Sequence, residues 1–153
     1  KFGGHAMAAG LSLDADKYED FSKAFADEVR SHLSESDLQG EIETDGDLLT
    51  GDLSLEMAEV ISEAGPWGQG FPEPTFDGKF NLVSQRIVGG RHLKLVLQSP
   101  GCDNYVDAIA FNIDLDEWPN HNCRSVNLAY RMDINEFNSR RRLQLIVQYV
   151  EPG

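Results

Sequence analysis

The pattern of apolar and polar residues changes its period about halfway along the chain. Between residues 14 and 33 the apolar side chains recur every three or four positions, which predicts an amphipathic helix. Its apolar face would carry Tyr18, Phe21, Phe25 and Val29. The stretch LSLEMAEVISEAG has the same period and predicts a second helix, with Ser54 as its N-cap residue and Gly65-Pro66 at its end. From Pro74 onwards apolar and polar residues alternate, as in strands with one buried face.

Five runs show this alternation, and turn residues separate them. They are FDGKFNLVSQRIV (76–88), HLKLVLQS (92–99), YVDAIAFNI (105–113), RSVNLAYRMDI (124–134) and RLQLIVQYV (142–150). A β-sandwich usually needs about seven strands, so five short strands favour a small closed or partly open barrel. An oligonucleotide/oligosaccharide-binding (OB) barrel is the natural candidate for this half of the chain.

The start of the chain predicts a loop, a short helix, a strand and then the amphipathic helix. Gly3-Gly4 predicts a turn with positive φ, and His5–Ala9 a short helix that ends at Gly10. Leu11–Leu13 alternates like a short strand. Further on, Glu41–Glu43 is a candidate strand between the two halves of the chain. We therefore expect an α+β protein with two domains, residues 1–36 and 37–153.

The charge of the chain is distributed unevenly. The formal net charge is −13, and residues 1–73 hold 17 acidic residues against four basic ones, whereas nine acids and nine bases cancel in residues 74–153. A strongly acidic protein is an unfavourable partner for nucleic acid, but here the second half is neutral. No apolar run is long enough to span a membrane, and no signal peptide is apparent. Cys102 and Cys123 are too few for a disulfide framework, which favours free thiols and a cytoplasmic location.

The segment Gly3-Gly4-His5 is a candidate phosphate-binding site. Two glycines allow the backbone to approach a ligand closely, and a helix beginning at His5 would add a positive N-terminus. The alternative is a glycine turn with a surface histidine. A second unusual stretch, GPWGQGFPEPTF, holds Trp67 and Phe71. It is either a rigid clamp between helix and barrel or an aromatic platform for stacking bases, and its prolines and glycines favour the clamp.

Two basic clusters lie in the predicted barrel. The first surrounds the Gly89-Gly90 turn and the second precedes the last strand; together they comprise Arg86, Arg91, His92, Lys94, Arg140, Arg141 and Arg142. Basic side chains interleaved with aromatic ones are typical of single-strand binding, although such clusters are also common on solvated faces. The sequence has no zinc-binding spacing, no P-loop and no nucleophile motif, so we predict neither a catalytic residue nor a metal ligand.

Two stretches together resemble a known family. GGHAMAAGLSL followed by an amphipathic helix is similar to the closing segment of the DHH-associated domain of DHH-superfamily phosphoesterases, which also occurs in bacterial nanoRNases. GPWGQGFPEPTFDGKF, with HLKL, DAIAF and DINEF after it, resembles the C-terminal region of the RecJ family, the bacterial single-strand-specific 5′→3′ exonucleases. The resemblance covers nearly the whole chain, and a nanoRNase-like chain acting on short RNA would not account for the barrel.

The resemblance implies roles for particular residues. The Gly-Gly-His loop of the family reaches over the metal centre of the DHH domain, so Gly3, Gly4 and His5 are expected to bind the substrate's phosphate. It also implies Mn²⁺ or Mg²⁺ in the complete enzyme, an N-terminal DHH domain as a partner, and contact with the single-strand DNA-binding protein. The acidic tail of that protein would suit Arg140–Arg142. Lys1 is then expected to mark a cut inside the associated domain.

The family's Asp-His-His motif does not occur in this sequence. A two-metal phosphoesterase needs such residues to activate water, so we expect the chain alone to be inactive. The resemblance implies a substrate-binding fragment of a single-stranded-DNA exonuclease that acts in recombination and repair. The alternative, favoured by the acidic first half, is a protein-interaction and structural module of the same nuclease that does not bind DNA.

Overall fold

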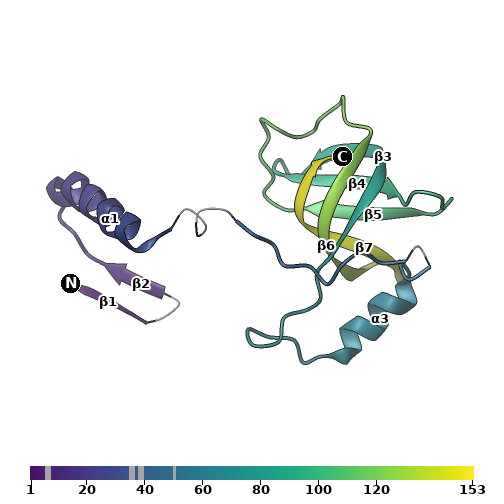
Figure 1. Cartoon of the computed structure of the whole chain (residues 1–153), viewed down its shortest axis with the longest axis horizontal. Helices are drawn as coiled ribbons and strands as arrows, with labels where there is room; N and C mark the ends of the chain where they lie inside the picture. Colours follow the sequence, from purple (N-terminus) through teal and green to yellow (C-terminus); the bar gives the residue numbers. More distant parts are fainter. Residues whose placement is uncertain (6–7, 35–36, 38–39, 50) are drawn as a thin grey trace. The chain divides into compact units, whose positions relative to one another are not determined.

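The computed structural model describes residues 1–5, 8–34, 37, 40–49 and 51–153. The chain divides into two units, Lys1–Glu41 and Ile42–Gly153, which Figure 1 shows in purple to blue and in blue to yellow. Among the helices in the described ranges, none is long and apolar enough to cross a membrane.

The first unit begins with two paired strands, which contain His5, Ala8 and Ala9 and so overturn the short helix predicted over His5–Ala9; residues 6 and 7 of that prediction lie outside the described residues. Strands β1 (Phe2–His5) and β2 (Ala8–Leu11) pair antiparallel, with Gly4 opposite Ala9. A helix of five residues forms few hydrogen bonds for the order it requires, whereas the pairing of β1 with β2 provides hydrogen-bond partners along both strands.

Gly4 is required for a reason other than the positive φ that the sequence predicted. Its φ is not in the left-handed region, but a Cβ built on Gly4 would lie 2.7 Å from the Cβ of Ala9. Real Cβ atoms do not approach this closely, so only glycine lets the two strands pack at this distance.

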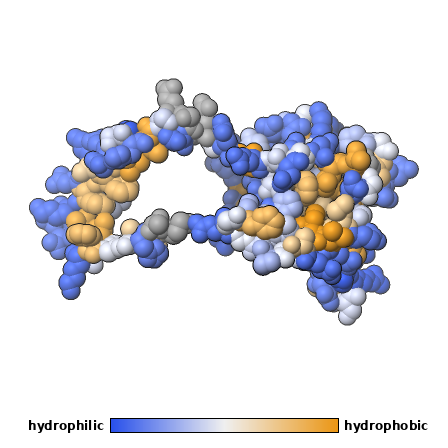
Figure 2. All heavy atoms as spheres, turned by 60° about the horizontal axis from the view of Figure 1, so that its bottom comes forward, coloured by the Kyte–Doolittle hydropathy of each residue, from blue (hydrophilic) through white to orange (hydrophobic). Residues whose placement is uncertain are grey.

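The amphipathic helix forms as predicted. After the 3₁₀ turn η1 (Ala15–Lys17), helix α1 runs from Tyr18 to His32, and Phe21 stacks on Phe25 with ring centroids 5.7 Å apart. None of its residues is buried, and Phe25 is 59% exposed. Figure 2 shows apolar side chains on the surface of this unit at the left. Among the described residues of this unit, the apolar face of α1 is therefore at most partly covered.

The second unit contains the predicted five-stranded barrel, and it confirms the expected α+β fold. The strands are β3 (Phe76–Val88), β4 (His92–Gln98), β5 (Tyr105–Ala110), β6 (Ser125–Phe137) and β7 (Arg140–Pro152). They form a closed barrel in the order β3-β4-β5-β7-β6, in which β5 and β7 are parallel and all other pairs are antiparallel. This arrangement is that of a five-stranded Greek-key OB barrel.

Strand β3 closes the barrel by pairing with the last strand in the order, β6, as well as with β4. Its residues 76–81 pair with β6 and its residues 81–88 pair with β4. A β-bulge lies between Leu82 and Ser84, just after the part of β3 that pairs with β6. A bulge bends a strand and increases its twist. The candidate strand Glu41–Glu43 does not form; Asp47 instead makes an isolated bridge to Asp77 at the start of β3.

The inward positions of the strands make the core, as their alternation predicts. The largest fully buried side chains are those of Leu93, Leu95, Leu97, Val126, Tyr130 and Leu145. Helix α3 (Leu55–Ala64) packs against β6 and β7 through its buried Ala58 and Ile61. The Ser54 hydroxyl accepts a hydrogen bond from the Met57 N–H at 3.1 Å, which confirms the predicted N-cap.

The stretch after α3 acts as a clamp through one of its two aromatic residues. Trp67 Nε1 donates a hydrogen bond to the carbonyl of Ile61 at 2.9 Å, and its ring packs against the core. Phe71 lies on the Trp67 ring with centroids 4.8 Å apart but is 60% exposed. Trp67 therefore holds the end of α3 against the barrel, whereas Phe71 fills no junction.

Burial of Tyr130 links the stability of the barrel to pH. Tyr130 is 1% exposed, and its burial, followed by the negative charges of Asp47 and Asp77, raises the pKa of this phenol above its ordinary value of 10.0. The unfolded chain therefore ionises first as the pH rises. The stability contributed by the neutral phenol is complete below pH 10 and is lost above it.

We expect the free energy of unfolding to fall above pH 10, with Tyr130 contributing up to about 1.4 kcal/mol per pH unit. The variant Tyr130→Phe has no phenol to ionise and should lack this part of the slope. Urea unfolding of both proteins between about pH 9 and pH 11.5 measures the difference. Equal slopes in the two proteins would contradict the role given to Tyr130.

Candidate functional site

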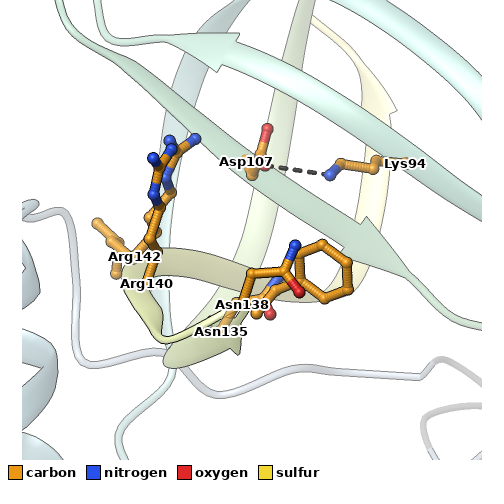
Figure 3. A pocket seen from close by; sticks show the side chains of 8 residues that line it. Lys94, Asp107, Asn135, Asn138, Arg140 and Arg142 are labelled. Atoms are coloured by element: carbon orange, nitrogen blue, oxygen red, sulfur yellow. Dashed lines mark ion pairs between the residues drawn. The ribbon is translucent and has the colours of Figure 1, made fainter.

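A groove of about 710 Å³ lies on the outer surface of the barrel, where β4 and β5 meet the hairpin of β6 and β7. We call it the hairpin groove (Figure 3). It is lined by Lys94, Asp107, Asn135, Phe137, Asn138, Arg140, Arg142 and Leu143. Three of the seven basic candidates from the sequence lie in it, together with polar and aromatic residues that the sequence did not single out.

The turn between β6 and β7 fixes the side chains at one end of this groove. Asn138 and Ser139 both have positive φ, 51° and 58°, as the two central residues of a type I′ turn do. This tight turn sets the register of the hairpin, in which Phe137 lies opposite Arg140 and Asn135 lies opposite Arg142. Cross-strand partners project from the same face, so all four side chains lie on the groove side.

Strand alternation divides the basic triplet. Arg140 and Arg142 project into the hairpin groove, and Figure 3 shows them extending side by side from β7. Arg141 projects to the other side of the strand, where its Nη1 lies 2.7 Å from Oε1 of Glu59 on α3. The positive charge of Arg141 is therefore balanced by a helix carboxylate. The triplet contributes two cations to the groove and one to the contact between helix and barrel.

An acidic residue in the groove opposes its positive charge. Lys94 Nζ lies 3.1 Å from Oδ2 of Asp107, with side-chain exposures of 26% and 36%. The pair is diagonal across β4 and β5, because Lys94 lies directly opposite Ile109. A ligand phosphate near Lys94 would therefore have to replace or share the Asp107 carboxylate. The charges of Arg140 and Arg142 form no ion pair among the described residues.

The remaining candidates of the first basic cluster lie outside the groove lining. Arg86 is exposed on β3 directly opposite Lys94, and Arg91 is exposed in the turn before β4. His92 accepts a hydrogen bond at Nδ1 from the Asn112 N–H at 3.1 Å, and its ring meets Phe111 edge-on. These contacts with the segment after β5 fix the orientation of the His92 ring. Its Nδ1 is occupied by the Asn112 N–H, which leaves Nε2 for any ligand.

The predicted phosphate site at Gly3-Gly4-His5 has a different local structure from the expected one. All three residues are exposed on strand β1, and His5 begins no helix. The positive helix N-terminus that was expected at His5 is absent for this reason. Any anion binding there would rest on backbone N–H groups of the strand and on the His5 ring.

Metal-ligating groups are not clustered in the part of the chain that the structure describes. Within those ranges, no set of three or more His, Cys, Asp or Glu side chains is arranged to hold a metal ion. Cys102 and Cys123 are free thiols, and Cys123 donates a hydrogen bond from Sγ to the carbonyl of Ser125 at 2.8 Å.

Apart from the apolar Leu143, sequence reasoning missed four residues of the groove: Asp107, Asn135, Phe137 and Asn138. A signal for the last three is present, because Asn138-Ser139 favours a turn and the residues that flank a tight turn must then pair. No local signal identifies Asp107 as a groove residue, because its position depends on β5 and β7 being neighbours.

Comparisons with known proteins give a consistent result. The family model of the RecJ OB domain matches residues 44–149. The single-stranded-DNA-specific exonucleases RecJ of Dickeya dadantii and Escherichia coli are 51% and 50% identical over 152 residues, and that of Bacillus subtilis is 27% identical over 151 residues. These matches cover 99%, 99% and 96% of this chain, but only 26%, 26% and 19% of the relatives. The chain therefore spans about a quarter of the length of its nearer curated relatives.

Two solved structures of RecJ from Thermus thermophilus, in complex with Mg²⁺ and with Mn²⁺, also resemble this chain. Both have a TM-score of 0.64 and cover 99% of this chain, at 22% and 25% sequence identity. The match covers 23% and 22% of those chains, so most of each lies outside the comparison.

The ion pair between Arg141 and Glu59 should couple α3 to the barrel in a measurable way. Because the two side chains are 49% and 36% exposed, solvent screens the pair, and we expect a coupling of about 0.5 kcal/mol. A double-mutant cycle with Arg141→Gln and Glu59→Gln, followed by urea unfolding, gives this value directly. Arg140→Gln serves as the control and should leave stability unchanged. Strictly additive effects of the two variants would show that the pair contributes nothing.

Proposed function

Since this chain belongs to the RecJ exonuclease family, we propose that it is a part of such an enzyme that holds single-stranded DNA. The observation that carries the proposal is the hairpin groove, in which Arg140 and Arg142 form no ion pair with described residues. The complete enzyme would hydrolyse single-stranded DNA from its 5′ end in recombination and repair. As a DNA-processing protein of bacterial type, it would act in the cytoplasm.

The position of the groove supports DNA as its ligand. OB barrels bind oligonucleotides on the face of their second and third strands and at the loop between the fourth and fifth. In this barrel those elements are β4, β5 and the hairpin of β6 and β7, which together line the groove. Arginine side chains pair with phosphate oxygens through several N–H groups, so Arg140 and Arg142 fit a nucleic-acid backbone.

The net charge of −13 does not oppose this proposal in the groove itself. The acidic excess lies within residues 1–73, whereas the segment that forms all five barrel strands is neutral overall. At physiological ionic strength a charge is largely screened beyond about 8 Å. The local charge of the groove therefore governs binding more than the total charge does.

A second candidate function, protein interaction, is favoured by a different surface of the same unit. A cavity of about 690 Å³ beside Trp67 and Phe71 is bordered by Glu43, Asp45 and Glu73. Arg131, which also lines the cavity, pairs with Glu73, so Glu43 and Asp45 remain as the acids that would suit a basic protein segment. The hairpin groove, in contrast, would accept the acidic tail of the single-strand DNA-binding protein, and such a tail would compete with DNA for Arg140 and Arg142.

The first unit would complete the substrate site in the whole enzyme. We place Gly3, Gly4 and His5 at the edge of a phosphate site whose other residues belong to the DHH domain. In this family the DHH domain bears the metal centre, so we propose that Mn²⁺ or Mg²⁺ is held by that domain in the complete enzyme. The chain alone would then contribute binding and positioning, and its nuclease activity would depend on the rest of the enzyme.

Removing the two groove cations should weaken the binding of single-stranded DNA. We expect the double variant Arg140→Gln/Arg142→Gln to lose on the order of tenfold in affinity for a labelled single strand of about 20 bases. The slope of log K against log salt should also fall by about 0.7 for each phosphate that the variant no longer neutralises. Fluorescence anisotropy at several salt concentrations measures both quantities.

Arg124→Gln is the matched control, because Arg124 is an exposed arginine that does not line the groove. It removes a positive charge of the same kind elsewhere on the barrel unit and should preserve the affinity of the wild-type chain. If the control and the double variant bind equally well, or if the wild-type chain does not bind at low salt, the DNA proposal fails. Weaker binding of an acidic peptide with unchanged DNA binding would favour the protein-interaction module.

The carboxylate of Asp107 should limit the affinity for DNA. The variant Asp107→Asn keeps the size of the side chain, removes its repulsion of phosphate and releases Lys94. Because exposed ion pairs contribute about 0.2–1 kcal/mol, we expect single-strand binding to tighten about two- to fivefold at low salt. The same anisotropy titration measures the change. Asp116→Asn, which changes the net charge equally in the segment between β5 and β6, should have no such effect; equal gains in both variants would mean that only total charge matters.

A further inference from the structure

The hairpin groove continues into a second groove of about 550 Å³. The second groove lies between the start of α3, at Ser54 and Leu55, and the strands β5 and β7. Asp107, Arg142 and Leu143 line both grooves, so the two adjoin along these residues. We call the second one the helix groove. Together they form one path along the outer surface of the barrel.

Each groove contains one aromatic ring that is largely exposed. Phe137 in the hairpin groove is 72% exposed, and Tyr105 in the helix groove is 64% exposed. Among the described residues, no other aromatic ring packs against either of them. Both rings are held on strands, at the end of β6 and at the start of β5, and not on long loops. Their faces are therefore accessible and their backbones are fixed.

The cations lie between the two rings along the strands. Phe137 is the cross-strand partner of Arg140, and Arg142 follows on the same face of β7. Asp107, which lines both grooves with Arg142, lies on the same face of β5 as Tyr105, about 7 Å along that strand. Arg141 also lines the helix groove, but its charge is paired with Glu59. The unpaired cations and the exposed rings thus follow the order of a ring, two guanidinium groups and a second ring.

A single strand of nucleic acid has the same order of chemical groups, because phosphates join its successive bases. Bases stack on aromatic side chains irrespective of sequence, since each base has a π-face, while cations contact the backbone. In a duplex the bases already stack on each other and pair with a second strand, so two separated rings cannot reach their faces. The arrangement of Phe137, Arg140, Arg142 and Tyr105 therefore selects an unpaired strand.

We propose that the two grooves form a single-strand track, in which one base stacks on Phe137, a second base stacks on Tyr105, and the phosphates between them contact Arg140 and Arg142. The track rests on the proposed function, because it specifies how the barrel holds single-stranded DNA. Binding by charge alone requires only phosphates, whereas the track also requires a ligand that has bases. A strand of phosphates and sugars without bases lacks half of its contacts in this track.

The test compares oligothymidylate of about 20 nucleotides with an abasic strand of the same length, using anisotropy and the full 153-residue chain. The wild-type chain should bind oligothymidylate about tenfold or more tightly than the abasic strand. Phe137→Ala and Tyr105→Ala should each lose about five- to tenfold in affinity for oligothymidylate and retain their affinity for the abasic strand. Phe137→Trp and Tyr105→Phe keep a ring at each position and should retain binding.

Tyr149→Ala is the matched control, because Tyr149 is 52% exposed on β7 and lines neither groove. It should bind both strands like the wild-type chain. A second measurement needs no variant: photo-crosslinking of a strand that contains 5-iododeoxyuridine should label Phe137 and Tyr105, and should not label Tyr149. Mass spectrometry of the digested chain identifies the labelled residues.

The outcomes separate the track from the proposed function. If the abasic strand binds as tightly as oligothymidylate, and the alanine variants bind like the wild-type chain, the rings do not stack bases and the track is wrong. Loss of binding in Arg140→Gln/Arg142→Gln would then still support a groove that binds phosphates. If the wild-type chain binds neither strand at low salt, both the track and the proposed function are wrong.

Discussion

The pairing of β3 with both β4 and β6 is the constraint on which the rest of this structure depends. It closes the barrel, and closure divides the residues of every strand into an inward and an outward set. The inward set fills the core with leucine, valine and Tyr130. The outward set of β4, β5 and β7 is then free to carry charge. The division of the Arg140–Arg142 triplet between groove and helix follows from the same alternation. Arg140 and Arg142 line the hairpin groove, whereas Arg141 between them pairs with Glu59.

The hairpin groove contains both cations that would attract phosphate and a carboxylate that would repel it. Arg140 and Arg142 form no ion pair among the described residues, whereas Lys94 is paired with Asp107, which lines both grooves. A groove of three uncompensated cations would attract phosphate more strongly than a groove in which one cation is paired with a carboxylate. Solvent reaches both members of the Lys94–Asp107 pair, so a phosphate can exchange for the carboxylate at modest cost. In the proposed function, these charges would make the binding of single-stranded DNA reversible and independent of the DNA sequence.

The sequence predicted the barrel well because each strand buries one face, and burial imposes a local alternation that a single chain reveals. Helix α3 and its Ser54 cap were predictable for a similar reason, since their signals are local. The error at His5–Ala9 has the opposite cause: the alanines favour a helix locally, but pairing with β1 is a longer-range contact that propensity ignores. In the groove, Lys94, Arg140 and Arg142 could be proposed from the sequence because they are basic residues in two clusters. The position of Asp107 was not, because it follows from the parallel pairing of β5 with β7, far apart in sequence.

The two units differ in how completely they are stabilised, and this difference bears on their roles. The barrel unit has a closed core and a helix that packs on it, so its groove is held by a rigid framework. The first unit has a hairpin and a helix with no buried residue in α1, and its Gly3-Gly4-His5 strand is exposed. A phosphate site on such a unit needs neighbouring protein to fix it, whereas a groove on the barrel does not. In the proposed enzyme the barrel would therefore bind the strand independently, and the first unit would act only once the metal-bearing domain completes it.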